Sequence, residues 1–164
     1  MKTIVSRLKT LVQDAKASTL PYVNYCEVIH PDIGLQDVSL SLLPSVFIIP
    51  VDTAEEWIAS QRKQATSTVR AYLVLRYNQR ELSIIGDSTR PQGQGILDFA
   101  ADFLSTVRGH RLASGGTDYL DKPLDIDSVE YIRDDISEDV FVIVAVVTMK
   151  CTRIFLQTTL PGNV

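Results

Sequence analysis

The sequence has few of the residues that carry most metal and redox chemistry. Its 164 residues include two cysteines, two histidines and one tryptophan. Neither Cys26 nor Cys151 has a second cysteine or a histidine at ligand spacing, which argues against a zinc site and against a disulfide framework. We therefore expect two buried thiols in a reducing compartment, and neither a metal nor a cofactor.

Catalytic motifs are also missing. There is no Gly-x-Ser-x-Gly elbow, and the glycines of Gln92-Gly93-Gln94-Gly95 lack the Gly-Lys-Ser/Thr ending of a phosphate loop. Adjacent carboxylates such as Glu55 and Glu56 diverge on a strand or a helix, whereas general acid-base catalysis needs convergent groups. The sequence predicts that the protein is not an enzyme and has no catalytic residues.

Long apolar runs are absent as well. The longest, Val140 to Val147, has eight residues, far fewer than the ~20 that a membrane-spanning helix needs. The first residues lead into an amphipathic pattern and not into the apolar centre of a signal peptide. We expect a soluble protein, cytoplasmic when made, with no membrane partner.

Charge is unevenly distributed along what we interpret as a single domain, residues 1–164. The formal net charge is -4, but residues 117–139 hold nine acidic and two basic residues, so this segment carries -7 and the rest +3. The pattern favours a solvated acidic loop at about 113–139. The alternative is an acidic surface that orients a subunit or repels nucleic acid. The candidate residues of that surface are Asp134, Asp135, Glu138 and Asp139.

Two amphipathic helices and several strands are predicted. Apolar residues recur at helical spacing over residues 3–17 and 96–107. Short strands are expected at 22–29, 44–50 and 126–132, and an alternating strand at 68–78. This order indicates an α+β domain, in which an N-terminal and a central helix pack on a mostly antiparallel sheet. Residues 158–164 are expected to form a flexible tail.

The strand predicted from Val140 to Leu156 is unusual. Both the even-numbered and the odd-numbered residues from Val140 to Val147 are apolar, so both faces of this strand should be buried. The core can bury one face, and the other face needs a further partner. An extended segment of this length reaches about 50 Å at roughly 3.3 Å per residue, more than a small domain normally holds. It must bend, bulge or leave the domain.

Residues 52–66 are polar and uneven, and they predict either a short helix or a long arm between two strands. The single tryptophan lies here, tucked onto its own domain or anchored in a partner. A polar face of the 68–78 strand could stack with nucleic-acid bases, but packing on a neighbouring subunit is favoured, because arginine and tyrosine are enriched at interfaces. The candidate interface residues are Trp57, Arg62, Lys63, Arg70, Tyr72 and Arg76.

This layout resembles the tail terminator proteins of long-tailed bacteriophages. The likeness lies in the order of the helix at 3–17, the strands at 44–50 and 68–78, the helix at 96–107 and the C-terminal strands. It implies a hexameric ring that caps the tail tube, fixes tail length and joins the neck or head. The implied partners are the tail tube protein and a neck or head-completion protein, with DNA only passing through the lumen. The implied location is the virion, reached from the host cytoplasm.

Three alternatives remain open from the sequence. The first is another neck, tail-completion or tail tube component. The second is a small cytoplasmic α+β binding or adaptor module, and the third is an enzyme whose groups converge only in the fold. A stable monomer with a single apolar pocket favours the adaptor module.

Overall fold

A computed structural model describes residues 1–30, 40–77, 84–86, 94–113, 116–137 and 140–156, without the side chains of Leu40 and of residues 134–137 and 140–141. The elements in chain order are α1 (Lys2–Ala15), β1 (Tyr25–Val28), the 3-10 helix η2 (Leu40–Leu42), β2 (Ser45–Ala59), β3 (Arg62–Tyr77), α3 (Ile96–Val107), β4 (Asp125–Ser137) and β5 (Val140–Leu156). The expected tail at 158–164 lies outside the described residues.

The strands form one sheet of five, in the order β1-β2-β3-β5-β4. β1 is parallel to β2, and the other pairs are antiparallel. The α+β class with a mostly antiparallel sheet is therefore confirmed. β3 and β5 lie at the centre and pair over their whole length, from Arg62 opposite Leu156 to Tyr77 opposite Phe141.

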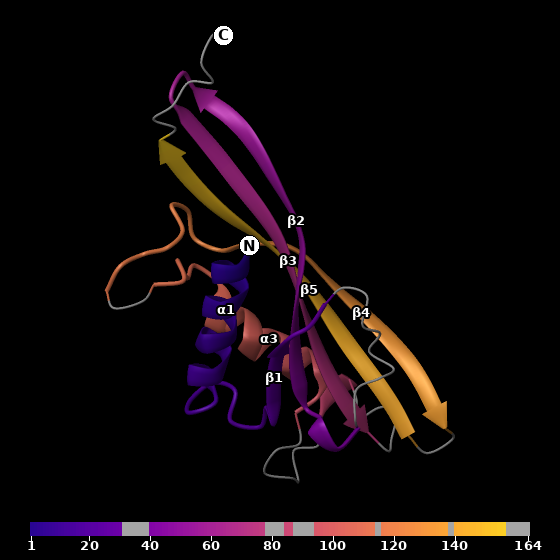
Figure 1. The fold of residues 1–164 in the computed structure, drawn as a ribbon. Coiled ribbons are helices and arrows are strands. Elements are labelled where there is room, and N and C mark those ends of the chain that lie inside the picture. Colours follow the sequence, from indigo (N-terminus) through magenta and orange to yellow (C-terminus); the bar gives the residue numbers. More distant parts are fainter. Residues whose placement is uncertain (31–39, 78–83, 87–93, 114–115, 138–139, 157–164) are drawn as a thin grey trace.

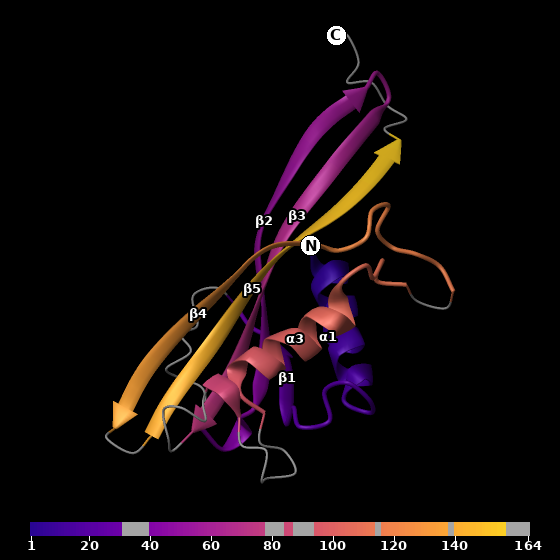
Figure 2. The same cartoon turned by 180° about the vertical axis from the view of Figure 1, so that it is seen from behind.

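Both helices lie side by side on one face of the sheet (Figures 1 and 2). α1 buries Ile4, Leu8 and Val12, while α3 buries Phe99 and Phe103. These side chains meet alternate residues of the central strands in one hydrophobic core. The apolar spacing in the sequence thus predicted both helices and the face that each of them buries.

The second face of the central strands has a smaller apolar cluster of its own. Phe47, Val74, Val144 and Val146 are each at most 6% exposed there. The expectation that one face of the Val140 to Val147 segment needs a partner beyond the core is therefore met within this chain. Side chains from β1 and from residues next to β2 pack around the cluster.

Of the two alternatives for residues 52–66, the structure has the long arm and not the short helix. The arm is itself made of strand, because β2 continues to Ala59, turns at Ser60 and Gln61, and returns as β3 from Arg62. The last residues of β5 add a third strand to this hairpin. The three strand ends extend well past the helices (Figure 1). We call this extension, residues 52–68 and 150–156, the arm.

The acidic loop expected at about 113–139 also needs correction. Residues 125–137 form β4, which pairs with β5 from Lys150 to Val140. The strand expected at 126–132 is thus present and longer than predicted. Charged side chains are compatible with this position, because β4 is an edge strand and charge discourages unwanted pairing at a sheet edge.

Candidate assembly surfaces

The tip of the arm presents an ordered aromatic and charged group. Trp57 and Lys63 are opposite each other on β2 and β3. The Lys63 ammonium lies 4.9 Å from the centre of the Trp57 ring, a cation-π distance. Lys63 Nζ also lies 3.4 Å from Glu55 Oε2. The Lys63 ammonium thus contacts both a carboxylate and the tryptophan ring, while half of the Trp57 surface remains exposed.

The arm tip also exposes large apolar side chains to solvent. Trp57, Ile58 and Leu156 are 51%, 45% and 64% exposed. All three lie at the end of the arm, because Trp57 is opposite Lys63, and Leu156 is opposite Arg62 on the other side of β3. Exposed apolar side chains gathered at the end of a projection mark a contact surface for another protein.

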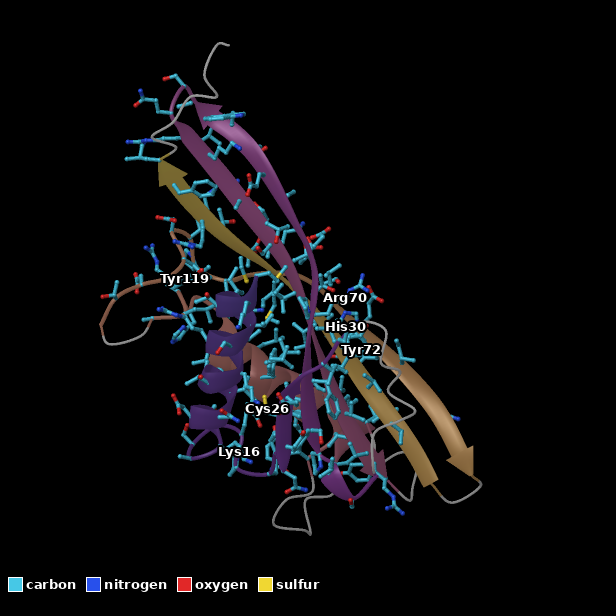
Figure 3. The ribbon with its side chains drawn as sticks, in the orientation of Figure 1. Lys16, Cys26, His30, Arg70, Tyr72 and Tyr119 are labelled. Carbon is cyan, nitrogen blue, oxygen red and sulfur yellow. The ribbon has the colours of Figure 1, made fainter. Side chains whose placement is uncertain are left out.

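The other three candidate interface residues lie elsewhere. Arg70, Tyr72 and Arg76 belong to the part of β3 in the body of the sheet, on the face opposite the helices (Figure 3 labels the first two). Arg70 and Arg76 are exposed, and Tyr72 is partly buried against the smaller apolar cluster. The six candidates therefore form two groups on different parts of the molecule: Trp57, Arg62 and Lys63 at the arm tip, and the other three on the sheet face.

Two of the acidic candidates, Asp134 and Asp135, lie at the opposite end of the sheet from the arm. Asp134 and Asp135 are the partners of Val142 and Phe141 in the β4–β5 ladder, but their side chains lie outside the described part of the structure. Glu138 and Asp139 lie outside it entirely. Nearby, Tyr131 is 49% exposed on this edge strand. The acidic end of the molecule is thus separate from the arm tip.

Sequence reasoning missed a segment that braces the arm. Tyr119 lies between two guanidinium groups, with Arg7 Cζ 4.6 Å and Arg153 Cζ 4.1 Å from its ring centre. Arg153 also donates a hydrogen bond of 2.9 Å to the Tyr119 hydroxyl. Figure 3 shows Tyr119 on the same side of the sheet as the helices. No local pattern signals this group, because its members are distant in sequence.

The segment is held on both sides of Tyr119. The Arg7 side chain donates to the Leu112 carbonyl at 2.7 Å, and Leu112, Leu120 and Leu124 are buried in the main core. Asp121 reaches β5, where its N–H donates to the Thr152 carbonyl at 3.1 Å and its Oδ2 accepts from the Ile154 N–H at 2.6 Å. α1, the connection before β4 and the arm are therefore joined by direct contacts.

Burial shifts the pKa of several side chains near the helices and the central strands. Desolvation raises the pKa of both cysteine thiols to about 12. Burial raises the pKa of Tyr22, with a further contribution from its hydrogen bond to Asp102. The described residues contain no group of three or more side chains suited to hold a metal ion. Within the same ranges, no helix has the length and apolarity to cross a membrane.

Comparison with known proteins finds a likeness in fold. No family profile and no curated protein matches the sequence. The fold is similar to that of a chain in a solved structure described as "Virion of native gene transfer agent (GTA) particle". The TM-score is 0.53 at 14% identity, over 91% of this chain and 94% of that one. At this identity the likeness concerns the fold alone.

Proposed function

We propose that this protein is a structural component of a phage-like virion. The observation that carries the proposal is the fold likeness to a virion chain, which spans nearly the whole of both chains. The arm with its exposed apolar tip supports it, because such a projection suits contact with another subunit. Under this proposal the protein has no catalytic activity.

Within the virion, we propose a tail terminator. Copies of the chain form a ring, with a hexamer as the expected size, that caps the tail tube and provides the joining surface for the neck or head. The arm tip contacts a neighbouring subunit or the tube protein, and the face with Arg70, Tyr72 and Arg76 is a second contact surface. A ring built in this way is a closed heterologous assembly, in which two different surfaces of each subunit meet.

The fold likeness supports other tail positions equally well. The description of the matched structure names the whole particle and not the role of the matched chain. A tail tube component or another neck or tail-completion protein therefore has the same support. Binding partners distinguish these roles. A terminator joins one end of a finished tube, whereas a tube component assembles along its whole length.

Native mass spectrometry of the purified protein, alone and mixed with tail tubes, tests the proposal. We expect a hexamer, or a monomer that becomes a ring when tubes are added. Negative-stain images of the mixture should show extra density at one end of each tube. A monomer at every concentration, with no binding to tubes, contradicts both the ring and the terminator role.

A further inference from the structure

The outer edge of β5 on the arm differs from the rest of that strand. The β4 ladder covers β5 only up to Lys150, which is opposite Asp125. Beyond this point β5 continues for six residues with β3 on its inner side. Among the described strands none pairs with this outer edge, and an open strand edge is a template for pairing with another chain.

Asp121 occupies this edge in the manner of a paired strand. Its main-chain N–H bonds the Thr152 carbonyl, and its carboxylate accepts the Ile154 N–H. A neighbouring strand would supply the same donor and acceptor from its main chain. One residue therefore satisfies two outward-facing groups that a second strand would otherwise bind.

The two edges of the arm are protected by different means. The β2 edge carries Asp52, Glu55 and Glu56, and charged side chains discourage strand pairing. The β5 edge, from Thr152 to Leu156, has no acidic residue, and its one charged side chain, Arg153, is held by Tyr119. Ile154, Phe155 and Leu156 give this edge a composition that favours β-pairing.

We propose that the β5 edge from Thr152 to Leu156 is a strand-pairing surface for the same edge of a second copy, and that Asp121 keeps it closed. An antiparallel pair of identical edges centred on residue 154 satisfies outward-facing main-chain groups of both chains at once and places Ile154 opposite Ile154. Tyr119, clamped between Arg7 and Arg153, positions the segment that carries Asp121. The proposal does not depend on the terminator role, because it concerns the isolated protein.

A cysteine reporter can detect this pairing directly. In the symmetric antiparallel register centred on residue 154, Ile154→Cys places two thiols opposite each other at Cα separations of about 5.5 Å, which a disulfide can bridge. The native thiols are buried and compete little. The reporter is combined with Asp121→Ala, or with Asp118→Ala as the control. Asp118 is a nearby exposed carboxylate whose Oδ2 lies 3.6 Å from Arg111 Nη1.

Under mild oxidation, we expect Asp121→Ala to raise the fraction of disulfide-linked dimer by about tenfold over the reporter alone, the order expected for losing one hydrogen bond to a charged group. The Asp118→Ala control should match the reporter alone. Tyr119→Ala, which releases the segment by a separate route, should also raise the dimer fraction. Sedimentation velocity of the variants without the reporter should show the same order of self-association, in any register.

Two results overturn the proposal. In the first, neither Asp121→Ala nor Tyr119→Ala increases dimer formation by either measurement. In the second, Asp118→Ala increases it as much as Asp121→Ala, which assigns the effect to net charge. Circular dichroism of each variant confirms that the sheet is intact. A failure here leaves the ring proposal untouched, since that is tested by binding to tubes.

Discussion

At Gly95 a neighbouring stretch of main chain lies so close that there is no space for a side chain. Gly95 precedes α3, and a Cβ at this position would lie 2.2 Å from the Ile84 carbonyl oxygen. Its φ is -80°, so the requirement comes from space and not from backbone conformation. The contact joins the start of α3 to the described residues 84–86.

Gly95→Ala should therefore destabilise the fold. Because the obstructing atoms belong to the backbone, the main chain must move, and we expect a loss of about 1–3 kcal/mol in the free energy of unfolding. Urea denaturation followed by circular dichroism measures it. Leu97→Ala, at an exposed position one residue into the helix, is the matched control and should change stability by about 0.5 kcal/mol or less.

The buried thiols predict a loss of stability in alkali. Folding raises the pKa of Cys26 and Cys151 from 9.0 to about 12, mainly by desolvation. The unfolded chain thus releases these protons first, so the stabilising contribution is complete below pH 9 and declines between pH 9 and 12. Denaturant titrations of the wild type and of Cys151→Ala across this range check the prediction. An equal pH dependence in both proteins would falsify the assignment to Cys151.

At the scale of the element, the sequence predicted structure best where a face is buried. The helices at 3–17 and 96–107 and the strand at 68–78 have apolar residues at a fixed period, because one side of each meets the core. Residues 52–61 have no such period, since both faces of this segment meet solvent, and so the sequence left a short helix and an arm as alternatives. The pairing of β2 with β3 and β5 decides its structure.

For the candidate surfaces too, the sequence indicated residue types but not how distant residues are arranged. Trp57 and Lys63 were identified by residue type, and they do lie in contact, but nothing local indicated their distance from Arg70, Tyr72 and Arg76. The Tyr119 clamp was missed because Arg7 and Arg153 are separated from it by much of the chain. Contacts between residues so far apart in the sequence depend on the order of strands in the sheet, which the sequence pattern did not specify.

Shortening the arm should separate folding from assembly. Thr53 and Ser67 are ladder partners whose hydroxyl oxygens are 2.9 Å apart, so replacing residues 54–66 with Asn-Gly should close a two-residue hairpin. The core lies elsewhere, and we expect the melting temperature to change by less than about 4 °C. Native mass spectrometry should then show loss of ring formation. An unaltered ring removes the arm tip as a subunit contact.

At the scale of the whole molecule, the sheet carries unlike surfaces at its two ends. One end is the arm with its apolar tip, and the other is the acidic end of β4 and β5 (Figure 1). Opposite ends with different chemistry suit an assembly in which each subunit contacts its neighbours through two different surfaces. An acidic surface facing a channel would also let DNA slide with little attraction.

Reversing the charge of Asp134, Asp135 and Glu138 together tests the role of the acidic end. In the terminator role, we expect lower infectivity, because a basic lining holds DNA or disturbs packing between subunits. Plaque counts and DNA ejection from the mutant particles measure this. Asp14→Lys, on the exposed face of α1, controls for a surface charge reversal elsewhere. Infectivity equal to wild type for the triple variant contradicts a lumenal position.

The position of β5 has a consequence for how the chain is made. Of the strands that the structure describes, β5 is synthesised last, yet it lies between β3 and β4 and completes the core beneath both helices. Until residue 156 leaves the ribosome, β3 has one free side and β4 has no partner at all. The complete sheet therefore forms only once β5 has been made, through contacts between distant residues that close slowly and leave strand edges open to other chains meanwhile.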